Sequence, residues 1–291
     1  MMLKGIFAND RFWIKSLIFT FLTIFGLITW INITRIFHLD QTNIISLQLG
    51  QLAFSIVGLA FPALASAYLF KKDEINYLHT DIFPTRRFIL LAVLVMLLIS
   101  PFINLITSWN EQISFPESLS KIEALFRKMQ TMTDDLTVRM LDRKSIYSLF
   151  ANLFFLALVP SITEELFFRG VLQRLLGEKI GAHLGIWIVA IIFSAYHMQF
   201  FGFFPRILLG ALLGYLLLWS NSLYLPIIGH FTNNATLIFF YFLSSRKVIS
   251  FNIDDIGIGN QWWLGLLSLI FVIPFFFYMN KKYLRFKEKI C

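Results

Sequence analysis

Apolar runs of roughly 20 residues, separated by short polar stretches, dominate this sequence. In lipid every backbone polar group must be satisfied internally, so such runs fold as transmembrane helices. About eight runs reach or approach the length that a span needs: 13–36, 51–70, 88–108, 147–169, 184–201, 206–220, 222–244 and 262–280. We therefore expect an all-α fold, a polytopic bundle of about eight transmembrane helices.

The composition argues against a soluble protein. The chain of 291 residues is 57% hydrophobic and only 14% charged, whereas soluble domains carry about 25% charged residues. We find no repeat or linker and expect a single membrane domain over residues 1–291, with a lipid bilayer as its surroundings. The net charge of +8 does not indicate a nucleic-acid partner, because the basic residues gather at the ends of apolar runs. The oligomeric state cannot be read from the sequence.

The basic residues predict the topology. They cluster before the first run, between the second and third, after the fourth and after the eighth: Lys4, Arg11, Lys15; Lys71, Lys72, Arg86, Arg87; Arg169, Arg174, Lys179; Lys281, Lys282, Arg285, Lys287 and Lys289. An even number of spans with both termini in the cytoplasm places all four clusters inside. The first run lacks a small-residue cleavage site and is expected to be a retained span. Composition favours a multi-pass protein of a bacterial plasma (inner) membrane.

The remaining segments carry fewer signals. In the polar stretch 109–146, apolar residues recur at helical spacing and predict an amphipathic helix on the external face. These residues are Ile122, Leu125, Phe126, Met129 and Met132. A single cysteine, Cys291, allows no disulfide framework within the chain.

Two adjacent carboxylates, Glu164 and Glu165, lie inside the fourth apolar run. An acidic or basic residue at the centre of a membrane helix costs about 2.5–3.5 kcal/mol on insertion scales, so such residues mark functional sites. Glu165 and Arg169 are four residues apart, share a helix face and can pair. Glu164 lies about 100° around the helix and can face a different neighbour. We therefore expect Glu164 to act and Glu165 with Arg169 to support it.

Two further spans contribute polar pairs with the same spacing. Phe193 and His197 share a face of the fifth span, and His230 and Asn234 share a face of the seventh. A carboxylate can activate water as a general base, a histidine can hold that water, and a histidine with an amide can donate to an oxyanion. A single buried His or Asn is often only a helix–helix contact, but this combination on three spans favours hydrolysis of an amide or ester.

Three motifs in order, E-E-x-x-x-R at 164–169, F-x-x-x-H at 193–197 and H-x-x-x-N at 230–234, resemble those of the CPBP family. This family of intramembrane proteases includes the CAAX prenyl endopeptidases and the bacterial Abi and bacteriocin-processing proteins. The resemblance covers about residues 145–245, which would form the catalytic core. It implies an intramembrane endopeptidase that hydrolyses a peptide bond of a membrane-associated or peptide substrate.

The resemblance also implies roles. Glu164 would activate water shared with His197, while His230 and Asn234 would stabilise the oxyanion. A metal such as zinc would be held by Glu164, His197 and His230, but the H-E-x-x-H motif is absent, and we favour chemistry without a metal. The cofactor is thus either none or a divalent ion.

Two other functions stay open. The protein could be a non-proteolytic scaffold or a bacteriocin self-immunity factor, which the intact motifs disfavour. A proton-coupled transporter also uses intramembrane carboxylates and histidines, but paired inverted repeats are not evident. A further expectation concerns depth: Glu164 and His197 meet only if the fourth helix is longer than its apolar run, continuing past Gly170 toward Leu176, or is kinked at Pro160.

Overall fold

The computed structural model describes residues 3–39, 43–71, 76–141 and 145–288, with no side-chain description for 285–288. Among these residues every regular element is a helix, which confirms the predicted all-α class. Three residues used in the sequence analysis, Lys72, Lys289 and Cys291, lie outside the described residues.

The first three spans occur where they were predicted. Helix α1 covers Phe12–Ile36 and α4 covers Arg86–Glu111. Between them α2 (Ile44–Ala53), the π-helical segment η1 (Phe54–Ala60) and α3 (Phe61–Phe70) form one continuous helix. It begins seven residues earlier than the apolar run, because the Asn43 side chain caps it by accepting a hydrogen bond from the Ser46 N–H at 2.8 Å.

The fourth helix is longer than its apolar run, as the predicted depths of Glu164 and His197 require. Its segments are α6 (Ile146–Asn152), η3 (Leu153–Leu158), α7 (Val159–Glu165), η4 (Leu166–Leu172) and α8 (Gln173–Ile180). Together they make an uninterrupted stretch of 35 residues. Segments η3 and η4 are π-helical and flank the two glutamates on both sides, and single-turn π-segments often occur at functional sites. The prediction of a helix that continues past Gly170 is confirmed.

The last four long helices are α9 (Ala182–Tyr196), α10 (Phe203–Ser220), α11 (Tyr224–Ser245) and α12 (Trp262–Glu288). Six helical stretches of the described residues are long and apolar enough to cross a membrane, and α9 is a shorter apolar helix. Many outer apolar side chains are exposed, for example Leu17 at 71% and Phe277 at 72%, as expected where lipid covers them. The chain is a helical membrane bundle, and the count of eight spans stays a prediction.

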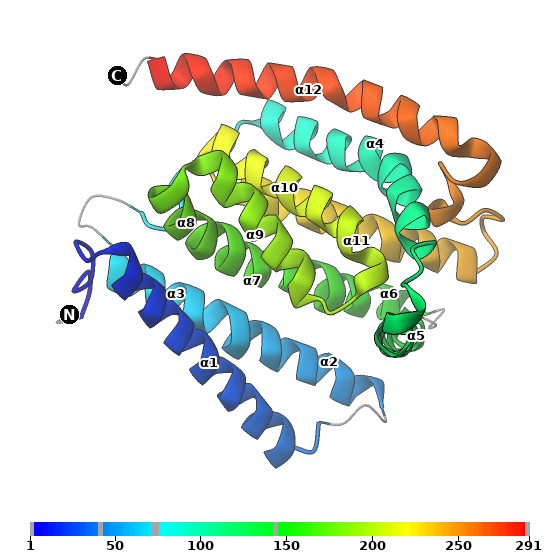
Figure 1. Ribbon diagram of the computed structural model, residues 1–291, viewed down its shortest axis with the longest axis horizontal. Coiled ribbons are helices and arrows are strands. Elements are labelled where there is room, and N and C mark those ends of the chain that lie inside the picture. Colours follow the sequence, from blue (N-terminus) through cyan, green and yellow to red (C-terminus); the bar gives the residue numbers. More distant parts are fainter. Residues whose placement is uncertain (1–2, 40–42, 72–75, 142–144, 289–291) are drawn as a thin grey trace.

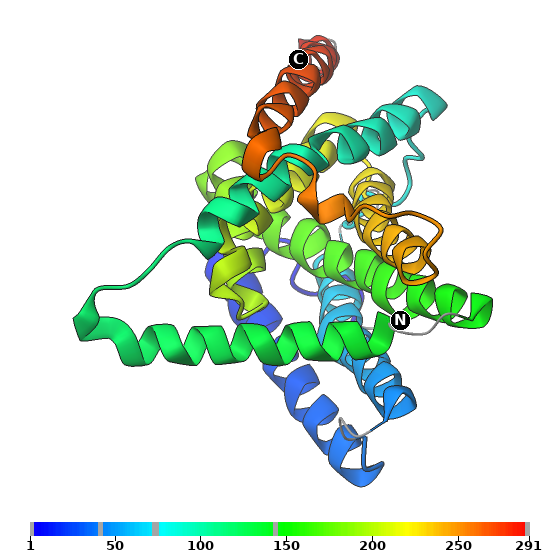
Figure 2. The ribbon, with the colours of Figure 1, turned by 90° about the vertical axis from the view of Figure 1, so that its right-hand side faces the viewer.

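The long helices lie side by side, with α12 and α4 at one edge of the bundle and α1 at the other (Figure 1). The start of α1 and the end of α12 lie at the same end of the bundle. Helix α5 (Ser120–Leu141) runs across the opposite end (Figure 2). The predicted helix in 109–146 is thereby confirmed, and its residues Ile122, Leu125 and Met132 are exposed.

The predicted fifth span, 184–201, is wrong at its C-terminal end. Helix α9 ends at Tyr196, and Met198 adopts a positive φ of 55°, a conformation that stops an α-helix. A short 3₁₀ turn, η5 (Phe200–Gly202), then leads into α10. His197 therefore lies at the end of a helix of 15 residues, about 22 Å long, which is shorter than the roughly 30 Å hydrocarbon layer.

This short helix brings Glu164 and His197 to the same depth. Helices α8 and α9 are joined by a tight turn at Gly181, whose φ of 89° favours glycine, and they pack against each other. Counted back from this turn at 1.5 Å per residue, Glu164 lies about 24 Å along its helix and His197 about 22 Å along α9. The two side chains can thus face one site.

Candidate active site

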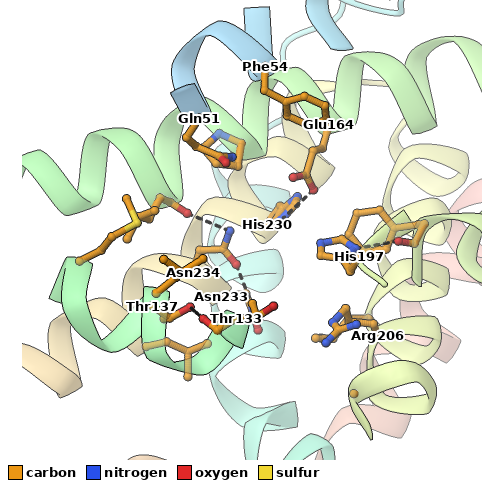
Figure 3. A pocket seen from close by; sticks show the side chains of 18 of the residues that line it. Gln51, Phe54, Thr133, Thr137, Glu164, His197, Arg206, His230, Asn233 and Asn234 are labelled. Carbon is orange, nitrogen blue, oxygen red and sulfur yellow. Dashed lines mark hydrogen bonds and ion pairs between the residues drawn. The ribbon is translucent and has the colours of Figure 1, made fainter. Parts of the chain in front are cut away.

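The three motifs line one cavity. It has a volume of about 820 Å³, and its wall includes Glu164, Phe193, His197, His230 and Asn234 (Figure 3). Residues from α1, α2, η1, α4, α5, η5 and α10 also line the wall. The predicted convergence of side chains from three separate helices on one space is therefore present in the structure.

Glu165 is the centre of a buried polar network. Its Oε1 atom accepts hydrogen bonds from Arg169 Nη1 and from His230 Nδ1, each at 2.8 Å. The side chains of Glu165 and Arg169 are fully buried, and Arg169 Nη2 donates to the Gly210 carbonyl of α10 at 2.9 Å. Arg169 also stacks on Phe193, with its Cζ atom 4.5 Å from the ring centroid. The network ties α7, α9, α10 and α11 together.

The expected Glu165–Arg169 pair is thus present, but the sequence analysis missed the contact between Glu165 and His230. A carboxylate that holds the Nδ1–H of a histidine fixes the ring orientation and leaves Nε2 for the site. No helical spacing could indicate this contact, because the two residues are 65 positions apart.

Glu164 is placed differently from its neighbour. Its side chain is buried yet lines the cavity, and among the described residues its Oε2 atom has no hydrogen-bond partner. Its Oε2 atom lies 3.9 Å from His230 Nε2. A buried, unpartnered acceptor is costly and is expected where a reactant completes the hydrogen bonding.

His197 presents its second nitrogen to the same space. Its Nδ1 lies 2.8 Å from the Phe193 carbonyl oxygen. Because a carbonyl only accepts, Nδ1 carries a hydrogen, and Nε2 of the neutral ring carries a lone pair. The rings of His197 and His230 pack on Phe193, with centroid distances of 4.9 and 6.0 Å, so this phenylalanine positions both histidines.

Asn234 is held by the π-helical segment η3 of the fourth helix. Its Nδ2 atom donates to the Leu156 carbonyl at 3.4 Å, and its Oδ1 accepts from Asn233 Nδ2 at 3.2 Å. Pro160 lies four residues after Leu156 and has no N–H to offer that carbonyl. One Nδ2 hydrogen of Asn234 is still free to reach into the cavity.

Several cavity residues were not singled out from the sequence. They are Gln51, Thr133, Thr137, Asn233 and Arg206. For Arg206 a signal existed, since it is an arginine at the start of an apolar run. Gln130, Thr133 and Thr137 of α5 line the cavity, whereas the sequence analysis considered only the apolar residues of this helix.

A metal ion can be tested against the donors present. Glu164 and the Nε2 atoms of His197 and His230 are suitable zinc ligands by type. However, no group of three His, Cys, Asp or Glu side chains in the described part of the chain lies close enough to hold one ion. The residues as placed do not form a metal centre.

The region that contains the three motifs is similar to a known protein family. Residues 146–236 match the family model of the type II CAAX prenyl endopeptidase Rce1-like proteins. This segment is similar to the Rce1-like proteins. It contains all seven residues of the three motifs, and the similarity supports a CAAX-type intramembrane protease family for this segment.

A curated relative is similar to part of the chain. The uncharacterized protein YpbD of Bacillus subtilis (strain 168) is 32% identical over 88 residues, which are 29% of this chain and 42% of YpbD. The chain therefore aligns with less than half of that protein's length. No solved structure matches the chain.

Proposed function

We propose that this chain is an intramembrane endopeptidase that hydrolyses a peptide bond with water activated by Glu164. The observation that carries the proposal is the contrast between the two glutamates. Glu165 binds Arg169 and His230 through Oε1 and is not part of the described cavity wall, whereas Glu164 lines the cavity and forms no hydrogen bond through Oε2 among the described residues. One carboxylate thus supports the site and the other is available to a reactant.

The reaction follows from these positions. A water between Glu164 and His197 gives a proton to the Glu164 carboxylate, and its oxygen attacks the carbonyl carbon of the scissile bond. A tetrahedral oxyanion forms. The carbon–nitrogen bond then breaks as the leaving nitrogen takes the proton from Glu164. The products are a carboxylic acid and an amine, and no covalent enzyme intermediate is needed.

His230 and Asn234 supply the proposed oxyanion donors. Asn234 donates through its free Nδ2 hydrogen, and His230 donates through Nε2 when both ring nitrogens carry hydrogen. Glu165 accepts the Nδ1–H hydrogen bond of His230 at 2.8 Å and fixes the orientation of the ring. Preorganised donors in a site that excludes water are worth more than the same donors in solution.

The proposed substrate is a peptide or a membrane-associated protein segment. A cavity of about 820 Å³ can hold several residues of extended chain. We further propose a bacterial inner-membrane location with both termini cytoplasmic, because the basic clusters gather at the end that carries the termini. A prenylated substrate does not suit such a location, despite the description of the family.

The proposal is tested by comparing membranes that contain the active protein with membranes that contain Glu164→Gln. Mass spectrometry should find uncleaved precursors only with Glu164→Gln. Glu117→Gln makes the same chemical change at an exposed position and should behave as the wild type. If no precursor accumulates and Glu164→Gln keeps the biological activity, the protein acts through binding and the proposal fails.

A further inference from the structure

Arg206 is a cation at the wall of the catalytic cavity. It lies in the first turn of α10 and lines the cavity together with His197 (Figure 3). Among the described residues of the wall it is the one arginine or lysine. An arginine in an apolar helix is costly and is expected to have a function.

The chain around Arg206 is built to hold its guanidinium. Nη1 donates to the Gln199 carbonyl at 3.2 Å, and Nη2 donates to the Gln199 side-chain oxygen. A Cβ at position 202 would overlap the Nη2 atom, so Gly202 makes room for the group. The positive φ of Met198 ends α9 and turns the chain into this segment. The fold therefore fixes the guanidinium and does not leave it to solvent.

This guanidinium keeps unused donors and no paired carboxylate. An arginine has five N–H donors, and Gln199 accepts two hydrogen bonds. Arg127, Arg169 and Arg174 each form an ion pair with a glutamate four residues away, whereas Arg206 forms no ion pair within 4.0 Å among the described residues. The acid that attracts it from a greater distance is Asp134 of α5, whose Oδ1 already accepts from Gln130 at 2.9 Å.

Negative and positive side chains lie at different places on the cavity wall. The carboxylates of Glu111 and Glu164 line the wall and repel an anion, while Arg206 attracts it. Figure 3 shows Arg206 and Glu164 on different sides of His197. A substrate that carries a negative group would therefore bind with that group at Arg206 and a neutral peptide bond near Glu164.

We propose that Arg206 binds a carboxylate of the substrate and thereby selects peptides with an acidic group near the scissile bond. The inference rests on the proposed peptidase function. Guanidinium and carboxylate match in a bidentate geometry with charge-assisted hydrogen bonds. The carboxylate comes either from the C-terminus of the peptide or from an Asp or Glu side chain, and the experiment separates these sources.

The test uses full-length protein in proteoliposomes and peptide libraries of random sequence, read by mass spectrometry. One library has free C-termini, a second has amidated C-termini, and a third has amidated C-termini without Asp or Glu. The wild type should cleave the third library on the order of 10- to 100-fold more slowly than the better of the other two, the range expected for hydrogen bonds to a charged group. A preference for the first over the second library assigns the terminal carboxylate, and equal cleavage of the two assigns the side chain.

Variants test whether Arg206 causes the preference for substrates with a carboxylate. Arg206→Gln should abolish the discrimination between libraries, and Arg206→Lys should keep part of it. Lys128→Gln removes one positive charge from an exposed position of α5 and should change nothing. The inference is overturned if the wild type cleaves all three libraries equally. It is also overturned if Asp134→Asn alone abolishes the discrimination as Arg206→Gln does, because the role of Arg206 would then be to hold α5 in place. If the wild type leaves every library intact, the proposed function fails together with it.

Discussion

Replacing Glu165 by glutamine should lower the stability of the protein, whereas the same substitution at Glu164 should abolish activity without lowering stability. Glu165→Gln removes the charge that balances Arg169 in a pair whose side chains are both fully buried and 2.8 Å apart. Breaking a buried ion pair costs about 3–5 kcal/mol, because the remaining charge stays uncompensated. Glu164→Gln removes a buried carboxylate whose Oε2 has no hydrogen-bond partner among the described residues and lies 3.9 Å from His230 Nε2. The substitution therefore relieves the desolvation of a charged group and loses only this longer contact.

The difference should appear in thermal unfolding of the purified proteins in one detergent. At about 2–4 °C per kcal/mol for domains of 150–250 residues, Glu165→Gln should lower the midpoint by about 6–20 °C. Glu164→Gln should leave it unchanged or raise it while abolishing peptide cleavage. The double variant Glu165→Gln with Arg169→Met should recover part of the loss, because the stranded cation is gone. Equal midpoints for Glu164→Gln and Glu165→Gln would refute the assignment of one supporting and one reacting carboxylate.

Three other outcomes are expected. Asn234→Ala should lower kcat about 10²- to 10³-fold with little change in KM, because its amide acts on the oxyanion; an effect confined to KM would contradict that role. Incubation with a zinc chelator should leave the cleavage rate unchanged within about twofold, since the described residues form no three-ligand site, and loss of activity that added zinc restores would contradict metal-independent chemistry. A fluorescent dye attached at Leu125→Cys should be quenched by brominated lipids, and the same dye attached at Thr133→Cys should not. The reason is that Leu125 is exposed and Thr133 lines the cavity. Equal quenching of the two dyes would place α5 away from the membrane surface.

The sequence predicted the helices well because their signal is local. Apolar length located the spans, and the depth of Glu164 required a fourth helix that is longer than its apolar run. The C-terminal end of α9 was missed, since apolar residues continue to Phe201 and the positive φ of Met198 has no local signature. The count of spans and the limits of the catalytic core at 145–245 stay predictions.

For the site, residue spacing predicted contacts within a helix and could not predict contacts between helices. Glu165 with Arg169 and His197 with Phe193 are four residues apart, and both contacts are present. The bond from His230 to Glu165 and the placement of Arg206 beside His197 depend on how α7, α9, α10 and α11 pack. The His230–Glu165 hydrogen bond and the position of Arg206 can therefore be known only from the structure.

The central claim is that Glu164 activates the hydrolytic water. Its most direct test is the rate at which purified protein in proteoliposomes cleaves one peptide, compared between the wild type and Glu164→Gln at equal amounts of folded protein. General base catalysis predicts a loss of about 10²- to 10⁴-fold. A Glu164→Gln protein that cleaves the peptide at the wild-type rate would contradict the account.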